Sequence, residues 1–248
     1  MTDAELMALI RTRYGAQLAA ACHPSSLPEA FLAAVVANES GGNPAAARPE
    51  PAVFTRLVNV AAGHQALFSC PGIRKPLSAT DLLAYASPGE LQPSQIVAEY
   101  QGPPFMPYPL GTGTEPLPGS PMPGAPARGL QWGLKRLGEL ATSWGLTQIM
   151  GWHLIEMAGY AGFRWTVGDL ADAGKNLLCA VALFTYFGEH YQLDPVREFE
   201  QLLRCWNTGT PDGATFDPMY VQNGLARMAA YSGLALAAPT PGAQPPAK

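Results

Sequence analysis

One glutamate of the chain is placed where a buried acid could do chemistry. Apolar side chains recur at helical spacing after Pro28, and Glu39 continues their buried stripe by three and four positions. The stripe consists of Phe31, Leu32, Val35 and Val36. Burial and the negative end of the helix dipole both favour the protonated form of a carboxyl group at this position. Such a glutamate can act as a general acid and give its proton to a glycosidic oxygen.

Three separated blocks of the sequence contain polar and small residues that suit such a site. They are Glu39–Pro44 (ESGGNP), Ser143–Gly151 (SWGLTQIMG) and Trp206–Gly209 (WNTG). In this order the blocks resemble the signature of the goose-type lysozyme and lytic transglycosylase superfamily. The resemblance implies a glycosidase that cleaves the β-1,4 bond between N-acetylmuramic acid and N-acetylglucosamine in peptidoglycan glycan strands, with Glu39 as the catalytic acid.

The second and third blocks supply the expected substrate-binding residues. The resemblance places the Ser/Gln block in a groove beside the acid, and it places the Asn-containing turn against the acid and the substrate. The residues assigned to substrate binding are Ser143, Gly145, Gln148, Ile149, Trp206, Asn207 and Gly209. Glycine permits close backbone approach, amides bond to N-acetyl and hydroxyl groups, and tryptophan packs on sugar rings. A purely structural role of Gln148 and Asn207, in a helix-end hydrogen bond and a turn, stays open.

Two residues of these blocks depart from the family pattern. Thr147 stands where methionine is usual, which is a modest change in the lining of the groove. Trp206 stands where tyrosine is usual, so a phenolic hydroxyl group that could bond to the acid is missing at this position. An indole N–H can donate a hydrogen bond instead, but it can neither accept one nor titrate. The first two blocks are also much further apart than in compact members of the family.

A second carboxylate would decide between two reactions. The family's transglycosylases use one glutamate as acid and then as base, whereas inverting hydrolysis needs a second carboxylate about 6.5–9.5 Å from the first. Glu50 is the preferred candidate, because the chain turns between Glu39 and the helix expected to begin at Pro51. The helix dipole alone also favours an acid at that place. Asp212 and Asp217 are lesser candidates, since they suit a turn and a helix cap.

Other chemistries have weaker support in the sequence. It contains no Gly-x-Ser-x-Gly, Walker or HExxH motif, so peptidase, esterase and nucleotide-binding activities are not indicated. His153 and Glu156 lie three positions apart but lack further metal ligands at suitable spacing, and we expect no metal and no cofactor. Cys179 and Cys205 fall in apolar helical patterns typical of buried thiols. The main alternative is a catalytically silent peptidoglycan- or chitin-binding module with a lysozyme-like fold, against which Glu39 argues.

The elements that must position these residues are mostly helices. The first begins after Ser26-Leu27-Pro28 and ends at Gly41-Gly42-Asn43-Pro44. Further helices are predicted from Pro51, over Leu82–Ala86 after a Ser78/Asp81 capping box, around Leu134–Leu140, over Ile149–Tyr160, after a Thr166/Asp169 box, over Leu177–Tyr191, and after Asp194-Pro195 and Asp217-Pro218. No alternating run demands a large sheet. The predicted fold is all-α and lysozyme-like, with a long Pro/Gly-rich insertion loop.

One catalytic domain is expected over residues 1–238. An inserted segment at about 63–128 interrupts it, and residues 102–128 of this insert are too rich in proline and glycine for a helix or a central strand. The Ala/Pro-rich tail, residues 239–248, is expected to be disordered.

Charge and hydropathy limit the partners of the protein. The formal net charge of −4 argues against a nucleic-acid-binding protein. No stretch approaches the roughly 18 apolar residues that a membrane span needs, and the acidic N-terminus lacks the basic region of a secretory signal. We therefore expect a monomer that is made in the cytoplasm. It would act on peptidoglycan in the periplasm or outside the cell after release or non-classical export.

Overall fold

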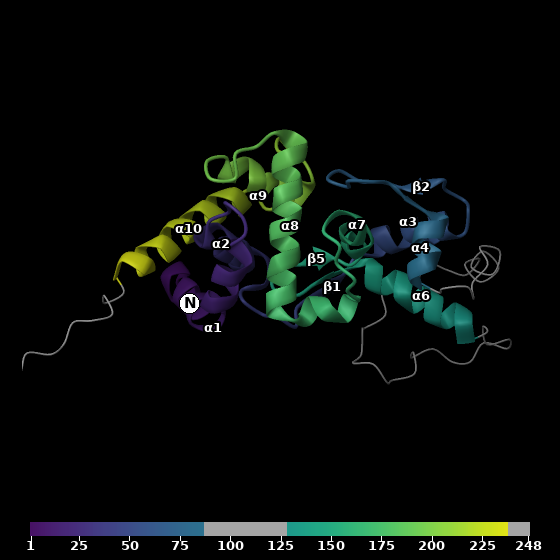
Figure 1. Ribbon diagram of the computed structural model, residues 1–248, viewed down its shortest axis with the longest axis horizontal. Coiled ribbons are helices and arrows are strands. Elements are labelled where there is room, and N and C mark those ends of the chain that lie inside the picture. The colour runs from purple at the N-terminus through teal and green to yellow at the C-terminus, as the bar shows by residue number, and fades with distance from the viewer. Residues whose placement is uncertain (87–127, 238–248) are drawn as a thin grey trace, which may run out of the picture. The chain divides into compact units, whose positions relative to one another are not determined.

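The computed structural model describes residues 1–86 and 128–237 of the chain (Figure 1). Within these residues there are nine α-helices, one short 3₁₀ helix and five strands of two or three residues. The predicted all-α class is thereby confirmed, while the lysozyme-like arrangement stays a prediction. The chain divides into two compact units. The first unit is Met1–Asn43 together with Ala173–Lys248, and the second unit is Pro44–Asp172.

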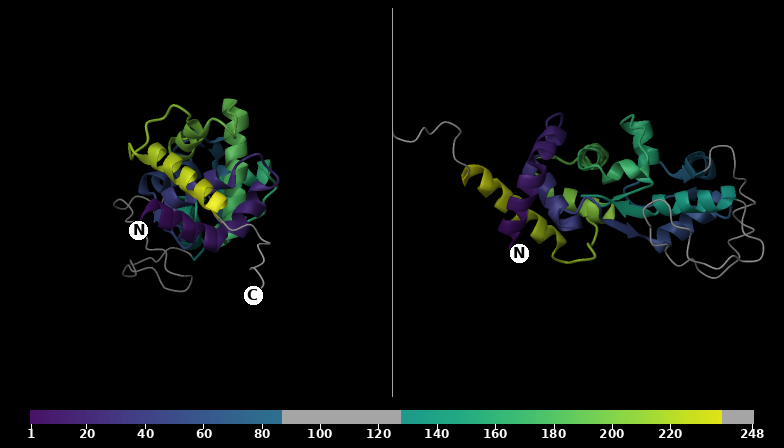
Figure 2. Two further views of the ribbon diagram at one scale, coloured as in Figure 1. Left: turned by 90° about the vertical axis from the view of Figure 1, so that its left-hand side faces the viewer. Right: turned by 90° about the horizontal axis from the view of Figure 1, so that it is seen from below.

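The described part of the first unit consists of five helices. They are α1 (Asp3–Cys22), α2 (Glu29–Ser40), α8 (Ala173–Tyr191), α9 (Phe199–Thr208) and α10 (Tyr220–Ala237). Every residue of α2 from Ala30 to Ala37 is buried, as expected of a helix that is apolar on all faces. The purple α1 and the yellow α10 pack against it (Figures 1 and 2). Phe31 meets Phe184 of α8 edge to face, with ring centroids 5.0 Å apart. The core of the first unit is therefore built around α2.

The second unit combines short helices with two small antiparallel sheets. Its helices are α3 (Pro51–Ala61), α4 (Ala79–Ala86), α6 (Arg128–Leu140), α7 (His153–Tyr160) and the 3₁₀ helix η1 (Val167–Ala171). One sheet has the order β1-β4-β5, formed by Ala47–Pro49, Thr142–Trp144 and Ile149–Met150, and the other pairs β2 (Leu67–Phe68) with β3 (Leu77–Ser78). The register places Ala47 opposite Trp144 and Ser143 opposite Met150. The second sequence block is therefore a β-hairpin.

Several helix ends agree with their predicted signals. α2 follows Pro28 and stops at Gly41, whose φ of 60° is left-handed. α3 has Pro51 in its first turn, a position where proline loses no hydrogen bond. α6 and α8 include the predicted helices around 134–140 and over 177–191. Two predicted capping boxes are formed, Ser78 with Asp81 before α4 and Thr166 with Asp169 before η1.

The helix predicted over Ile149–Tyr160 begins later than expected. Ile149 and Met150 form β5 and pair with β4, so their backbone groups are engaged in the sheet. The helix, α7, begins at His153. The apolar residues of this segment suit a strand and a helix equally, and the short strand was not recognisable from periodicity.

The two predicted starts at Asp-Pro pairs are also wrong. α9 begins at Phe199 and not after Asp194-Pro195, and α10 begins at Tyr220 and not directly after Asp217-Pro218. The Asp194 carboxylate accepts a hydrogen bond from the Val196 backbone N–H at 2.9 Å, and the Asp217 carboxylate accepts one from the Met219 backbone N–H at 2.8 Å. The aspartates thus close separate turns ahead of the helices.

The longest helix of the first unit, α1, has no counterpart among the predicted elements. Its start is nevertheless marked by a capping box. The Thr2 hydroxyl oxygen accepts from the Glu5 N–H at 3.3 Å, and the Glu5 carboxylate accepts from the Thr2 N–H at 2.7 Å.

The small sheet β1-β4-β5 was likewise not predicted, because strands of two or three residues are too short to show alternation.

Two predicted segments lie outside the described residues. They are the Pro/Gly-rich loop 102–128, apart from Arg128 at the start of α6, and the tail 239–248. One catalytic domain over 1–238 with an insert at about 63–128 stays a prediction, and the observed units divide the chain at other positions. Within residues 1–86 and 128–237, no helix has both the length and the apolarity that crossing a membrane requires.

Candidate active site

Glu39 lies in the last turn of α2, as predicted. It is half-buried. The helix ends directly after it because Gly41 and Gly42 take positive φ values of 60° and 82°, which glycine adopts without a Cβ clash. The hydroxyl group of Tyr14 in α1 donates to the Gly42 carbonyl oxygen at 3.0 Å. The turn that follows the acid is therefore fastened to a neighbouring helix.

A tyrosine from the C-terminal part of the chain contacts the carboxylate of Glu39. The hydroxyl group of Tyr220, the first residue of α10, donates a hydrogen bond to Glu39 Oε1. Burial is the main cause that raises the pKa of Tyr220 well above its ordinary value, and the charge of Glu39 and the hydrogen bond to it act in the same direction. The phenol is therefore protonated in neutral solution and remains a donor to the acid.

A chain of polar contacts fixes Tyr220 against α2. The Asn38 side-chain N–H donates to the Tyr220 backbone carbonyl oxygen at 2.9 Å. The Asn38 side-chain oxygen accepts from Arg227 Nη1 at 2.7 Å, and Arg227 Nε pairs with Asp3 of α1 at 2.8 Å. α10 approaches α2 closely at Gly224, where a Cβ atom would lie 3.2 Å from Asn38 Nδ2. Three helices of the first unit thus hold the hydroxyl group on the acid.

The third sequence block closes α9 in the same unit. Trp206 is half-buried and stacks on Phe184 of α8, with ring centroids 4.6 Å apart. Asn207 is exposed in the last turn of the helix. Gly209 is the left-handed C-cap with φ of 84°, and its carbonyl oxygen accepts from the Tyr191 hydroxyl group at 2.6 Å. Asn207 is therefore the member of this block whose side chain is most open to a ligand.

The second sequence block is a hairpin of the second unit that Gln148 ties together. Gln148 Oε1 accepts from the Ser143 hydroxyl group at 2.9 Å, and Nε2 donates to the carbonyl oxygens of Ala46 and Gly145 at 3.1 and 3.0 Å. Both N–H groups of this amide are thus used within the protein. Its backbone is left-handed, with φ of 54°, which is uncommon outside glycine. Gln148 positions the hairpin, which is the structural role that the sequence left open.

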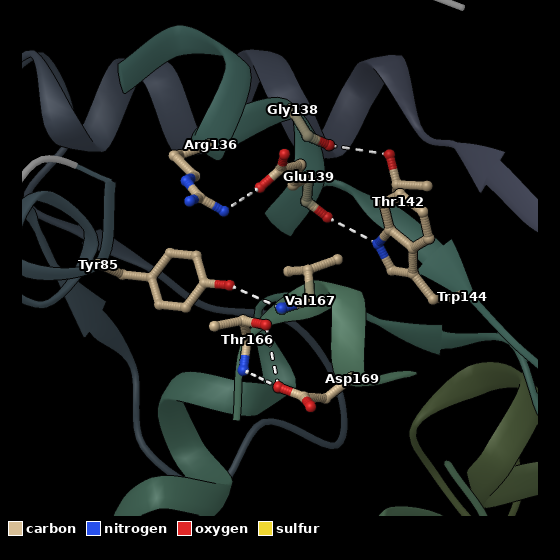
Figure 3. Close-up of polar contacts among 9 residues, drawn as sticks. All are labelled: Tyr85, Arg136, Gly138, Glu139, Thr142, Trp144, Thr166, Val167 and Asp169. Carbon is tan, nitrogen blue, oxygen red and sulfur yellow. Dashed lines mark hydrogen bonds and ion pairs between the residues drawn. The ribbon is translucent and has the colours of Figure 1, made fainter. Parts of the chain in front are cut away.

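The other residues of the second block are largely enclosed. Ser143 and Ile149 are only 2% and 1% exposed. Gly145 turns the chain with φ of 75°. Trp144 is half-buried, and its indole N–H donates to the Glu139 carbonyl oxygen near the end of α6 at 2.9 Å (Figure 3). The hairpin brings the residues of the block together but buries the side chains of Ser143 and Ile149.

Beside the hairpin, one polar contact lies within α6 and another joins α4 to η1. Arg136 pairs with Glu139 at 2.9 Å, and the Tyr85 hydroxyl oxygen accepts from the Val167 N–H at 3.1 Å (Figure 3). Burial is the main cause that raises the pKa of Tyr85 above its ordinary value. The side chains of Arg136, Glu139 and Tyr85 thus have structural roles within the second unit.

Glu50, the predicted second carboxylate, also belongs to the second unit. It precedes α3, its backbone N–H donates to the Ala141 carbonyl oxygen at 2.8 Å, and its Oε1 pairs with Arg48 Nε at 2.8 Å. Its side chain is 32% exposed. The ion pair with Arg48 is a sufficient structural reason for an acidic residue at position 50. A catalytic role is not needed to explain it. Asp212 and Asp217 are both exposed.

The His153/Glu156 pair is a core contact of the second unit. Glu156 is buried, and its Oε2 meets His153 Nδ1 at 2.9 Å. Its Oε1 accepts the backbone N–H groups of Arg74 and Lys75 at 2.6 and 3.2 Å. The carboxylate therefore fastens the segment between β2 and β3. In the described part of the chain, no group of three or more His, Cys, Asp and Glu residues could hold a metal ion.

All four cysteines are free thiols. Cys22, Cys179 and Cys205 are buried, and burial raises the pKa of each to about 12. Cys70 is half-buried, and burial together with the charge of Glu156 raises its pKa to about 11. The prediction of buried thiols at Cys179 and Cys205 is confirmed. Such thiols are poor nucleophiles, because the thiolate is the reactive form.

Tyr220 is the residue of the site that sequence reasoning missed. Its partner Glu39 is 181 positions away, so no local pattern connects the two. The one available signal was the missing phenol at Trp206, which could have prompted a search for a tyrosine at another helix start.

No protein-family model, no curated protein and no solved structure matches the chain.

Proposed function

We propose that the chain cleaves peptidoglycan glycan strands at the β-1,4 bond between N-acetylmuramic acid and N-acetylglucosamine, with Glu39 as the general acid. The observation that supports this most is the hydrogen bond from the buried Tyr220 hydroxyl group to Glu39 Oε1. It fixes the orientation of one carboxyl group at a half-buried helix end. A general acid needs a fixed orientation toward the bond that it breaks.

The same hydrogen bond has a role in the chemical step. When Glu39 gives its proton to the glycosidic oxygen, negative charge develops on the carboxylate. A donor that already points at this carboxylate stabilises the charge without further reorganisation. Hydrogen bonds to charged groups contribute about 1.5–3 kcal/mol, which corresponds to a factor of about 10 to 100 in rate. Tyr220 is therefore proposed as the residue that positions and stabilises the acid.

The choice of peptidoglycan as substrate rests on the three sequence blocks and the family that they resemble. The exposed amide of Asn207 can bond to the N-acetyl and hydroxyl groups of a sugar. Gln148 is proposed to act through the hairpin backbone that it holds, because its amide groups are engaged there. Ser143 acts in the same indirect way as the donor to Gln148.

The reaction can end in hydrolysis or in ring closure. With Glu39 alone, the same group returns as the base, and the sugar's own 6-hydroxyl group closes an anhydro ring. Hydrolysis with inversion needs a second carboxylate about 6.5–9.5 Å from the first. Glu50 is the candidate. It is proposed for this role from the sequence alone, and its Oε1 pairs with Arg48.

The catalytic assignment is tested by release of dye from labelled, purified peptidoglycan. Glu39→Gln keeps the shape of the side chain and removes the proton donor, so we expect activity to fall at least about a hundredfold. Glu29→Gln is the matched control, because Glu29 is an exposed residue in the first turn of the same helix. Equal dye release by the wild type and Glu39→Gln would exclude Glu39 as the acid.

Mass spectrometry of the released products identifies the reaction. Anhydro-muropeptides indicate a transglycosylase, and muropeptides with reducing ends indicate a hydrolase. If Glu50→Gln hydrolyses at the wild-type rate, Glu50 is not the base. A wild-type protein that sediments with peptidoglycan but releases no dye would be the catalytically silent binding module instead.

A further inference from the structure

A fully exposed phenylalanine stands in the loop that connects α9 to α10, residues 209–219. Phe216 is 100% exposed, and Met219 in the same loop is 46% exposed. A single exposed apolar side chain is common, whereas exposed apolar patches are typical of binding surfaces. Here two exposed apolar side chains stand three positions apart in one loop. Phe216 and Met219 are therefore candidates for contact with a ligand.

Hydrogen bonds hold the backbone of the α9–α10 loop in place. Arg204 Nη1 in α9 donates to the Gly213 carbonyl oxygen at 3.1 Å. The Thr215 hydroxyl group donates to the Asp217 carbonyl oxygen at 2.7 Å. Phe216 lies between Thr215 and Asp217, so its neighbours on both sides are held. A held backbone lowers the conformational freedom that the loop itself loses when it binds a ligand.

The α9–α10 loop leads directly to the partner of the proposed acid. Phe216 precedes Tyr220 by four residues, so their Cα atoms lie no more than about 14 Å apart. The hydroxyl group of Tyr220 donates to Glu39. The exposed Asn207 stands just before the other end of the loop. A short oligosaccharide is long enough to contact Phe216 while one of its bonds lies at Glu39.

We propose that Phe216 is a substrate contact that packs on the ring of an N-acetylglucosamine unit of the glycan strand, with Met219 beside it. The inference rests on the proposed function, which places the strand at Glu39. An aromatic face suits the apolar face of a sugar ring. The only charged residues of the loop sequence are the acids Asp212 and Asp217. The Arg204 guanidinium that contacts the loop at Gly213 is paired with Glu200, so the charge around the loop stays negative. Like charges disfavour the anionic stem peptides of peptidoglycan and leave the neutral sugar as the fitting occupant.

The test measures binding of the β-1,4-linked tetramer of N-acetylglucosamine, which carries no peptide. Calorimetric titrations use the Glu39→Gln protein so that the ligand stays intact. In this background we expect Phe216→Ala to raise Kd about tenfold or more, and Phe216→Tyr to keep the affinity because it keeps the ring. Val196→Ala is the matched control, since Val196 is 46% exposed in the separate segment before α9, and it should leave Kd unchanged.

Activity on peptidoglycan gives a second measurement with Glu39 intact. Phe216→Ala should raise KM while kcat changes little, because the ring contacts substrate away from the reacting bond. Its thermal unfolding should match that of the wild type, since a fully exposed side chain contributes little to folding. Loss of kcat with unchanged KM would overturn the assignment of Phe216 as a substrate contact.

The outcomes separate this inference from the proposed function. An unchanged Kd in Phe216→Ala, while Glu39→Gln is inactive on peptidoglycan, would overturn the inference alone. A raised Kd with no cleavage by the wild type would support the sugar contact and refute the catalytic proposal. Failure of the Glu39→Gln protein to bind the tetramer would overturn the inference. A dimer that Phe216→Ala converts to a monomer in light scattering, with unchanged Kd, would assign the ring to contact with a second copy.

Discussion

At the scale of single residues, a phenol reaches Glu39 although position 206 holds a tryptophan. Trp206 stacks on Phe184 within the helical core, so its indole serves the packing of α9. The hydroxyl group at Glu39 comes from Tyr220 at the start of α10. Asn38, the neighbour of the acid, holds the Tyr220 backbone as well. Adjacent residues at the end of α2 thus engage both ends of one tyrosine.

Tyr220→Phe removes the donor and keeps the ring. Because the phenol stabilises the carboxylate, we expect kcat to fall by a factor of about 10 to 100. Glu39 must be protonated to act as the proposed general acid, and losing a donor to the carboxylate favours protonation. The alkaline limb of the pH–rate profile should therefore move to higher pH. Rates of peptidoglycan cleavage measured across neutral and alkaline pH check both effects.

A second tyrosine of the same helix provides the control for this experiment. Tyr231 is also buried in α10, and burial is the main cause that raises its pKa. Its ring faces the Arg11 guanidinium at 5.5 Å. Tyr231→Phe should leave the position of the alkaline limb unchanged. A shift of equal size in both variants would mean that the effect is a general response of α10.

At the scale of elements, the helix ends that are marked by glycine or proline were the most predictable part of the fold. Gly41 ends α2 and Pro51 begins α3 because of their own backbone conformations. The sequence therefore predicts both helix ends without knowledge of the tertiary packing. The same reasoning failed after Asp194 and Asp217, because an aspartate before proline can close an isolated turn as readily as a helix. The capping box of Thr2 and Glu5 ahead of α1 is likewise a local pattern that the sequence shows.

The candidate site was predictable only as far as local sequence reaches. Glu39 at a helix end was predicted from the spacing of its neighbours. That spacing did not select a face, because α2 is buried on every side from Ala30 to Ala37. The contact with Tyr220 depends on how α10 packs on α2, and the bonds of Gln148 depend on a hairpin of very short strands. Both are results of tertiary packing, which one sequence does not display.

The turn after α2 allows a prediction from two neighbouring glycines. Gly41→Ala places a Cβ in open space at φ of 60°, so it should destabilise the protein by about 1 kcal/mol through backbone strain alone. Gly42→Ala has similar strain at φ of 82°, and its Cβ would also lie 3.3 Å from Ile10 Cγ1. We expect the second variant to be the less stable one in urea unfolding. Equal stabilities would show that Ile10 moves away freely.

The hairpin allows a prediction about Gln148. Gln148→Ala deletes one accepted and two donated hydrogen bonds, so we expect a loss of about 2 kcal/mol of stability at roughly 1 kcal/mol or somewhat less for each bond. Ser143→Ala removes one of these bonds and should destabilise less. Urea unfolding measures both variants. A raised KM of Gln148→Ala on peptidoglycan, with unchanged stability, would instead assign Gln148 to direct contact with the substrate.

At the scale of the whole molecule, the first unit is assembled from both ends of the described chain. α1 and α2 come from the N-terminal segment, and α8, α9 and α10 come from the C-terminal segment. α1 packs on α8 and α10, and α2 packs on α10. The helix of the acid and the helix of its tyrosine are therefore parts of one core. Loss of either segment should remove the site together with the fold of that unit.

Thiol labelling tests whether the two segments unfold together. Cys22 lies on α1, whereas Cys179 and Cys205 lie on α8 and α9, and burial raises the pKa of each thiol to about 12. The thiolate is the reactive form, so iodoacetamide should not label these thiols at pH 8 until the first unit unfolds. Short pulses at increasing urea, followed by peptide mass spectrometry, should give one shared midpoint for all three. Cys70 reports separately on the second unit. Labelling of Cys22 at lower urea than Cys179 and Cys205 would show that α1 detaches on its own.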